Sequence, residues 1–256
     1  MTARILVTGG TGTLGRQVVG RLAQAGPTVR VLSRRPAPAD RPEEIEWVVG
    51  DLALGTGVEE AVAGVGTIIH CASDFRRARK GVPGTRRFLG TARRAGVRHV
   101  VYISIVGVDR VPLGYYQVKL AEERLVEESG VPWTILRATQ FHDLIRLLLA
   151  TTARLPVMLV PSLRVQPIDA SEVAARLVDL AAGPPVGRAP DLGGPQVRAF
   201  RDLASAYLRA TGKRRLVFPL RLPGSTFRGY RQGGHLTPAH AEGRRTFEEY
   251  LAAQFG

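Results

Sequence analysis

The chain has 256 residues, of which 45% are hydrophobic and 23% are charged, as is typical of folded globular proteins. These values exclude a disordered chain and a fibrous repeat, and the length fits one large α/β domain with a small appendage. The formal net charge of +14 suggests a polyanionic partner, but the arginines that dominate it are spread along the whole chain. We therefore expect no nucleic-acid partner.

Several other classes of protein are disfavoured by the sequence. No apolar run approaches the roughly 18 residues that a membrane span needs, and the first residues lack the pattern of a secretory signal. The single cysteine, Cys71, has no partner for an internal disulfide, and the histidines show no metal-ligand spacing. We expect a cytoplasmic monomer or homodimer without a membrane partner or a metal.

Up to about residue 138, short apolar β-branched runs alternate with longer helical patterns. Strands of this kind are buried on both faces, and Gly26, Gly96 and Gly130 stand where left-handed helix ends are expected. The alternation predicts an α/β fold with a doubly wound parallel sheet, the Rossmann fold. The predicted strands are 4–8, 28–33, 45–49, 67–71, 99–104 and 133–137, and the predicted helices are 13–25, 56–63, 81–95 and 115–129.

Beyond residue 138 the rhythm changes, and stretches rich in Pro, Gly and Arg separate the helical patterns. We interpret residues 1–138 as the cofactor-binding core, and residues 139–256 as a smaller α/β region that packs on this core in one structural unit and forms the walls of a substrate site. The predicted elements are helices at 140–153, 170–182, 199–211, 225–232 and 242–253, and an extended run at 164–168.

A glycine-rich turn, "VTGGTGTLG", follows the first strand directly and opens the first helix. Its glycines have the G-x-x-G-x-x-G spacing. Glycine lets the backbone approach a pyrophosphate closely, and the helix N-terminus offers unpaired amides and a positive dipole end. Threonine hydroxyls, including that of Thr8, are further candidate donors. The residues that we expect to bind the cofactor here are Gly9, Thr11, Gly12, Thr13, Leu14 and Gly15.

The end of the second strand is expected to contact the adenosine ribose of the cofactor. A cofactor without a 2′-phosphate usually has Asp or Glu there, whereas this chain has Ser33, Arg34 and Arg35. Guanidinium groups favour a phosphate, so the sequence predicts NADP(H) over NAD(H). After the third strand, Asp51 and Leu52 are placed to contact the adenine, although a turn-forming aspartate is an alternative interpretation of Asp51.

The segments "TGGTGTLG", "SRR", "GDL", "YIS" and "YYQVK", in this order, resemble the short-chain dehydrogenase/reductase superfamily and in particular its atypical, NmrA-like NAD(P)H-binding branch. The resemblance implies a cofactor across the carboxyl ends of the strands and a substrate pocket beneath the C-terminal region. Cys71, Ala72 and Ser73, at the end of the fourth strand, would contact this cofactor. The branch contains quinone reductases, other reductases, non-redox enzymes and cofactor-binding sensors.

Tyr115 and Lys119 have the Y-x-x-x-K spacing of the superfamily's catalytic pair, and Ser104 supplies a candidate third hydroxyl. A carbonyl that accepts hydride builds negative charge on oxygen, which a tyrosine neutralises by proton donation while a serine holds the oxygen. A nearby lysine lowers the pKa of the tyrosine and would also hold the nicotinamide ribose. In the NmrA-like branch the tyrosine is often missing, so Tyr115, like Tyr116, is alternatively a wall of the pocket.

The segment after the sixth predicted strand holds further candidates for the substrate pocket. Gln140 and Phe141 are expected to line it. His142 is either a proton carrier that faces the substrate or a surface histidine at the start of a helix, and we favour the second interpretation. His70 and Cys71 are neighbours on a strand and point to opposite faces, so we expect them to be packing residues.

The leading hypothesis is an NADPH-dependent reductase of a small carbonyl, enone or quinone. One alternative keeps the Tyr115 and Lys119 pair but catalyses a redox-free dehydration or isomerisation of a cyclic or polyketide-like substrate. The other is a non-catalytic sensor that binds NADP and regulates a partner. Fold resemblance alone does not separate these three functions.

Overall fold

The computed structural model describes residues 4–39, 41–72 and 78–256. They divide into two units, which we describe separately. Unit 1 comprises Met1–Ser104, Gln117–Leu136 and Val173–Ala189, and unit 2 comprises Ile105–Tyr116, Arg137–Glu172 and Pro190–Gly256.

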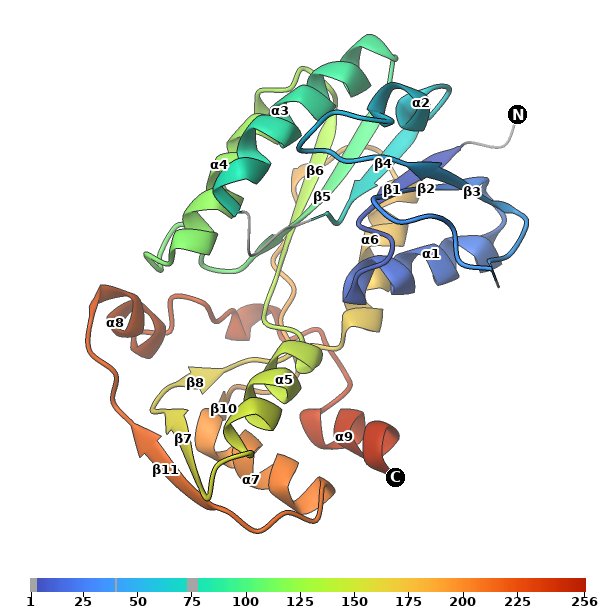
Figure 1. Ribbon diagram of the computed structural model, residues 1–256. Helices are drawn as coiled ribbons and strands as arrows, with labels where there is room; N and C mark the ends of the chain where they lie inside the picture. The colour runs from blue at the N-terminus through green and yellow to red at the C-terminus, as the bar shows by residue number, and fades with distance from the viewer. Residues whose placement is uncertain (1–3, 40, 73–77) are drawn as a thin grey trace. The chain divides into compact units, whose positions relative to one another are not determined.

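A parallel seven-stranded sheet forms the centre of unit 1, in the order β3-β2-β1-β4-β5-β6-β9 (Figure 1). This order, with crossovers from β3 to β4, is that of a doubly wound Rossmann-type sheet, so the predicted fold class is confirmed. Its strands are β1 (Ile5–Thr8), β2 (Val29–Ser33), β3 (Ile45–Val49), β4 (Thr67–His70), β5 (His99–Ile105), β6 (Trp133–Ala138) and β9 (Gly187–Arg188).

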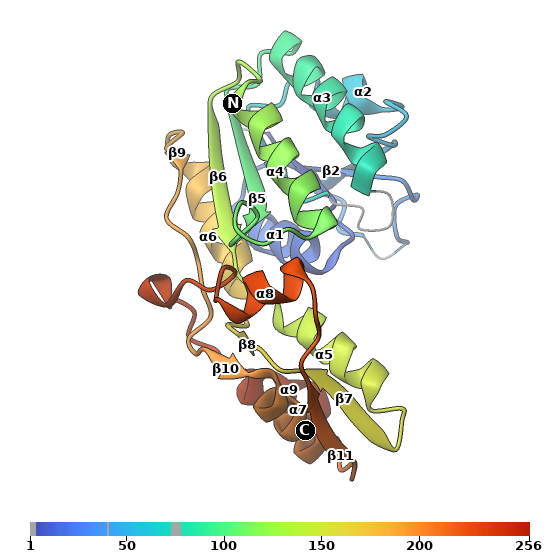
Figure 2. The ribbon, with the colours of Figure 1, turned by 90° about the vertical axis from the view of Figure 1, so that its left-hand side faces the viewer.

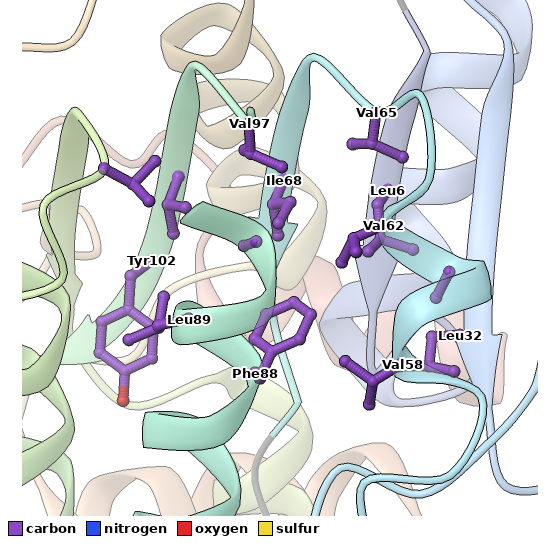
Figure 3. Packing of buried hydrophobic residues seen from close by; sticks show 14 of the residues in the cluster. Leu6, Leu32, Val58, Val62, Val65, Ile68, Phe88, Leu89, Val97 and Tyr102 are labelled. Carbon is purple, nitrogen blue, oxygen red and sulfur yellow. The ribbon is translucent and has the colours of Figure 1, made fainter. Parts of the chain in front are cut away.

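Helices cover both faces of this sheet because successive side chains of each strand point to opposite sides. On one face, Leu6, Ile68 and Tyr102 pack with residues of the covering helices such as Phe88 and Leu89 (Figure 3). Helices α1 and α6 lie on the other face (Figure 1). The helices are α1 (Thr13–Ala25), α2 (Val58–Val62), α3 (Ala78–Arg94), α4 (Gly114–Glu127) and α6 (Ala170–Ala182).

Gly26 and Gly96 end helices as predicted, whereas α4 ends at Glu127, three residues before Gly130. Gly26, which caps α1, has φ +90°, and Gly96 and Gly130 have φ +74° and +72°. Only a residue without Cβ adopts this conformation at little cost. The six predicted strands and the four helices before residue 138 are confirmed, with ends shifted by at most a few residues. Helix α6 and strand β9 belong to unit 1 although they follow residue 138.

Unit 2 contains two small two-stranded sheets. Strands β7 and β11 pair in parallel (Figure 2), and β8 and β10 pair antiparallel. The core of the unit is formed by α5, α7, α9 and the inner side of β7, through residues such as Leu149, Met158 and Leu203. The elements are α5 (His142–Thr152), β7 (Val157–Pro161), β8 (Arg164–Val165), β10 (Arg198–Ala199), α7 (Phe200–Ala210), β11 (Leu216–Leu220), α8 (Ser225–Arg231), a 3₁₀ turn (Pro238–His240) and α9 (Phe247–Phe255).

The sequence did not predict the β7–β11 pair. Each strand carries a proline, Pro161 in β7 and Pro219 in β11, and a proline weakens a strand assignment made from sequence. The last helix was expected to begin near residue 242, but it begins at Phe247. Thr246 caps this start and forms a capping box with Glu249. Among the described residues, no helix is long and apolar enough to cross a membrane.

Candidate functional site

The carboxyl ends of the central strands of unit 1 bring the predicted cofactor-binding segments together. Thr8, the last residue of β1, has Leu32 of β2 and His70 of β4 as its neighbours across the sheet. Beyond the strands, the amide of Cys71 donates to the Thr8 carbonyl at 3.1 Å, and the amide of Ala72 donates to the Thr8 hydroxyl at 3.3 Å. The glycine turn, the end of β2 and the end of β4 therefore lie at one edge of the sheet.

The glycine turn is a tight backbone cradle. Gly9 has φ +71°, and a Cβ on it would lie 2.7 Å from the backbone nitrogen of Ala72. A Cβ on Gly15 would overlap the carbonyl oxygen of Gly9, so both positions require glycine. Gly12 begins α1 without a side-chain cap, and no acidic residue stands in the first turn of the helix. The amide of Gly12 donates to the carbonyl of Gly9 at 2.9 Å. The amides of the first turn of α1 have no partner within the helix and are suited to an anionic ligand.

Thr11, Gly12 and Thr13 are exposed on the turn, whereas Leu14 and Gly15 are buried beneath it. This pattern fits a dinucleotide pyrophosphate, which requires exposed backbone donors above a closely packed helix start. The structure thus agrees with the expected shape of the turn, and the contacts of the individual residues with a cofactor stay predictions.

Ser33, Arg34 and Arg35 follow one another at the end of β2. Ser33 is buried, and its hydroxyl accepts a hydrogen bond from the amide of Arg35 at 3.1 Å. The side chains of Arg34 and Arg35 are exposed. The backbone at the end of β2 is therefore held by Ser33, and the two exposed arginines that follow are residue types suited to a phosphate ester.

Asp51 closes a turn with its own carboxylate. Its Oδ1 accepts hydrogen bonds from the amides of Ala53 at 2.7 Å and Leu54 at 3.4 Å. This is the turn-forming arrangement that the sequence left open as an alternative. Leu52 is half-buried against the hydrophobic core. The adenine contact of Asp51 and Leu52 stays a prediction.

Lys119 is buried in unit 1, with only 2% of its surface exposed. Its Nζ lies 4.1 Å from the ring centroid of Tyr102 and 3.7 Å from Oε2 of Glu122. Burial lowers the pKa of the Lys119 ammonium, and the Glu122 carboxylate acts in the opposite direction. The aromatic ring below the ammonium and the carboxylate beside it therefore fix the position of the positive charge.

Glu122 is itself buried and receives two further hydrogen bonds. The hydroxyl of Tyr102 donates to Oε2 at 2.7 Å, and the hydroxyl of Thr85 donates to Oε1 at 3.1 Å. Tyr102, Thr85 and Glu122 were not predicted as supports of Lys119. The spacing of three residues between Lys119 and Glu122 was the available signal, since such residues are neighbours on a helix.

His70 is a packing residue, as expected, whereas Cys71 is half-buried and its contact with the cofactor stays a prediction. The His70 ring lies between Phe88 and Tyr102, with ring centroids 5.2 and 5.5 Å away, and its Nδ1 is 2.6 Å from the Thr8 hydroxyl. Burial lowers the pKa of His70 to about 3 and raises the pKa of the Cys71 thiol to about 12. Neither group is ionised near neutral pH, so the pair does not function as a nucleophile and a base.

The hydroxyl of Ser104, near the end of β5, is buried and has no hydrogen-bond partner among the described residues. An unpaired buried hydroxyl is costly unless a ligand or water completes it. Tyr102 pairs with His70 across the sheet, so Ser104, two residues further along β5, lies at the level of Ala72. Ser73, a predicted contact of the cofactor, lies outside the described residues.

In unit 2, the two tyrosines at the start of α4 differ in burial. Tyr116 is only 4% exposed, and its ring meets that of Tyr230 edge-on at 6.1 Å. Burial, and then the neighbouring Tyr230, raise the pKa of Tyr116. The expectation that Tyr116 is as accessible as Tyr115 is therefore wrong, because Tyr115 is half-buried and Tyr116 belongs to the core. Tyr115 stays the candidate proton donor.

Residues 140–142 are held by pairing with Ile168. The amide of Ile168 donates to the carbonyl of Gln140, and the amide of His142 donates to the carbonyl of Ile168, both at 2.9 Å. Gln140 and Phe141 are half-buried, and their place in a substrate pocket stays a prediction.

The favoured interpretation of His142 as a surface histidine is wrong. His142 is fully buried, and its Nε2 lies 3.0 Å from the carbonyl oxygen of Arg245. Its ring packs against Phe247 and Tyr250, with centroids 5.6 and 5.2 Å away. Burial lowers the pKa of His142, which keeps the ring neutral inside the core. Among the described residues, no group of acidic residues, histidines and cysteines is arranged to hold a metal ion.

Comparison with known proteins adds to this geometry. The profile of a family described as "NAD(P)H-binding" matches residues 9–182, which include the glycine turn, the end of β2 and Lys119. Among curated relatives, a (4-alkanoyl-5-oxo-2,5-dihydrofuran-3-yl)methyl phosphate reductase of Streptomyces griseus is 37% identical over 140 residues, covering 54% of this chain and 48% of the relative. The ceramide reductase of Caulobacter vibrioides is 32% identical over 199 residues, covering 72% and 62%.

The chain spans about half the length of the first of these relatives. Solved structures match it over nearly its whole length. The NADPH-dependent quinone oxidoreductase of Escherichia coli in complex with NADPH has a TM-score of 0.84 at 21% identity, covering 98% of this chain and all of that one. The triphenylmethane reductase of a Citrobacter species in complex with NADP(H) has a TM-score of 0.78 at 20% identity, covering 98% and 99%. At these identities, the likeness shows the fold. The predicted resemblance to an NAD(P)H-binding family is confirmed.

Proposed function

This chain belongs to the NAD(P)H-binding family, and we propose that it is an NADPH-dependent reductase of a small carbonyl, enone or quinone. The observation that supports this proposal most is the set of groups at the carboxyl edge of the unit 1 sheet. There, an uncapped helix start adjoins two exposed arginines, while Lys119 and the unpaired Ser104 hydroxyl are buried in the same unit. Relatives that are named as reductases support this function.

The residues of unit 1 fit a phosphorylated dinucleotide. The amides of the first turn of α1 would hold the pyrophosphate, and Arg34 and Arg35 would bind the 2′-phosphate of NADPH in preference to the two hydroxyls of NADH. When bound, NADPH supplies a hydride to an electrophilic carbon.

The residues of the chain would manage the proton and the charge on the substrate oxygen. Tyr115 would donate its hydroxyl proton to this oxygen, so that hydride and proton together reduce a carbonyl to an alcohol. Ser104 would donate a hydrogen bond to the same oxygen, which would satisfy its buried hydroxyl. Lys119, four residues after Tyr115 in α4, would favour the ionised tyrosine after proton transfer and hold the ribose.

The test measures NADPH oxidation, by absorbance, with a panel of quinones, enones and small ketones. We expect turnover with at least one class, NADPH preferred over NADH, and a loss of about 100-fold or more in kcat for Tyr115→Phe, since acid catalysis contributes about 10²–10⁴-fold. Tyr116→Phe is the matched control, because it removes one hydroxyl from the adjacent buried residue and is expected to keep the activity.

Three outcomes would contradict the proposal. Turnover without any nicotinamide cofactor, lost in Tyr115→Phe, would indicate a redox-free elimination or isomerisation. Tight NADPH binding without oxidation across the panel would indicate a sensor. Equal activity of Tyr115→Phe and the parent chain would remove the proton donor from the mechanism.

A further inference from the structure

The β7–β11 sheet of unit 2 has an apolar face that is exposed. Leu216 and Phe218 of β11 pair with Val157 and Leu159 of β7. Partners in a parallel pair point to the same side of the sheet, and Leu220, two residues after Phe218, continues the row. All five side chains are exposed, and Leu216 is exposed to 74%. We name these residues, Val157, Leu159, Leu216, Phe218 and Leu220, the open sheet face.

The opposite face of the same sheet is covered. Met158 and Val160 are buried in the core of unit 2 with residues of α7, and Val217 packs against that cluster. Parallel sheets are normally buried on both faces, and a two-stranded sheet has little stability by itself. The inner side of the pair is therefore packed through Met158, Val160 and Val217, and the outer side is apolar and exposed, which is the pattern of a surface that binds another body.

The residues at the ends of β11 are cationic. Lys213, Arg214 and Arg215 lie just before the strand, Arg221 follows it directly, and all four are exposed. The segment 211–235 contains no aspartate or glutamate. Arg154, also exposed, precedes β7. An apolar row with positive charges at its ends is complementary to a partner surface that has an apolar interior and anionic groups at its boundary.

We propose that the open sheet face docks this protein on a membrane surface that carries anionic lipids. The five apolar side chains would enter the boundary between headgroups and acyl chains, and the flanking arginines would bind the lipid phosphates. The charges disfavour a second copy of this chain as the occupant. Two copies joined through this face would bring two sets of like charges together.

This docking requires no spanning helix and is independent of the proposed reductase function. The expectation that the protein has no membrane partner came from the lack of an apolar span and from the even spread of arginines. The sequence alone did not reveal that residues 216–220 form an exposed strand, with alternate side chains directed away from the core.

The test is co-sedimentation of the whole chain with vesicles of phosphatidylcholine alone or of phosphatidylcholine with phosphatidylglycerol. We expect binding to the anionic vesicles that weakens as salt is added, because salt screens the charges. The double variant Leu216→Ser/Phe218→Ser should reduce the partition coefficient by about tenfold or more, since it removes two buried apolar side chains from the bound state.

Two controls match these changes. Leu54→Ser changes a leucine of unit 1 that is exposed to 72%, close to the 74% of Leu216, and should leave vesicle binding unchanged. The second control belongs to a charge variant. Arg214→Gln/Arg215→Gln removes two of the flanking positive charges and should weaken binding to the anionic vesicles. Arg21→Gln/Arg124→Gln removes the same charge from two exposed arginines of unit 1 and should have a smaller effect.

The proposal is overturned if the parent chain fails to bind anionic vesicles, or if binding survives Leu216→Ser/Phe218→Ser. An equal loss in Leu54→Ser would also overturn it, because the effect would not be specific to this face. Sedimentation velocity without lipid gives the competing outcome. A dimer that is lost in Leu216→Ser/Phe218→Ser would assign the open sheet face to a second copy.

Discussion

The two parallel sheets of this protein are completed in different ways. The seven-stranded sheet of unit 1 has helices on both faces, whereas the β7–β11 sheet of unit 2 has a core on one face and exposed apolar side chains on the other. Near the carboxyl edge of the unit 1 sheet, the buried Ser104 hydroxyl has no partner among the described residues. Unit 2 also has unpaired buried polar atoms, on Gln140, His142, Glu172 and His235, but its small sheet exposes a row of apolar side chains. The first pattern fits a small polar ligand, and the second fits an extended apolar partner.

The largest effect is expected at the glycine turn of unit 1. Gly15→Ala places a Cβ against the backbone carbonyl of Gly9, so the turn must open. We expect the free energy of unfolding to fall by about 3 kcal/mol or more and cofactor binding to be lost. Gly20→Ala is the matched control in the same helix, because a Cβ there meets nothing within 4 Å. It should stabilise the chain by about 0.5–1 kcal/mol. Urea unfolding of both variants measures the difference.

The buried cation of unit 1 should be almost as sensitive. Lys119→Met leaves the Glu122 carboxylate buried without its cation, so we expect a loss of about 3 kcal/mol in the free energy of unfolding. The double variant Lys119→Met/Glu122→Gln removes both charges and should recover part of this loss. If the loss in the double variant equals the sum of the losses in Lys119→Met and Glu122→Gln, the two side chains do not interact.

Acid should destabilise both units through their buried histidines. Burial lowers the pKa of His70 in unit 1 to about 3 and that of His235 in unit 2 to about 4. Both rings stay neutral in the folded chain, whereas the unfolded chain takes up protons below about pH 6.5. The unfolded state then binds more protons, so stability falls as the pH drops from about 6.5 towards 4.

Each of these histidines should contribute roughly 2 kcal/mol of this loss between pH 7 and pH 5. Urea unfolding at the two pH values measures it. His70→Phe and His235→Phe should each flatten the pH dependence, and His240→Gln, a change at a histidine whose side chain is 43% exposed, is the control. A pH dependence that is the same in all three variants would contradict the assignment to the buried rings.

Cofactor selectivity should show a smaller and more local effect. Arg34→Gln/Arg35→Gln removes two exposed guanidinium groups from the end of β2. We expect NADPH to bind about 30-fold more weakly, equivalent to about 2 kcal/mol, while NADH binding changes little. Fluorescence titration with both cofactors measures the two constants. An equal loss for both would mean that the arginines contact something other than the 2′-phosphate.

The same difference between the units decides what the sequence could predict. In unit 1, strand identity follows from apolar runs, and helix ends follow from glycines such as Gly26, so most elements were predicted within a few residues. In unit 2, β7 and β11 depend on each other across more than fifty residues of chain, and each contains a proline. A short apolar run does not reveal its partner, so this sheet and its exposed face were not predicted.

The sequence also did not predict which of the candidate site residues are buried. From the sequence, Tyr115 and Tyr116 were both possible walls of the pocket. The burial of Tyr116 and its contact with Tyr230 show that Tyr116 is a core residue. His142 was expected at the surface, but Phe247 and Tyr250, about a hundred positions later, enclose it. Long-range packing of this kind leaves no local pattern in the sequence.

The central claim, that the glycine turn of unit 1 binds NADPH, is tested most directly by calorimetric titration of the purified chain. We predict one NADPH bound per chain, more tightly than NADH, with binding lost in Gly15→Ala and kept in Gly20→Ala. No measurable heat at millimolar NADPH, or equal binding by Gly15→Ala and the parent chain, would contradict this account.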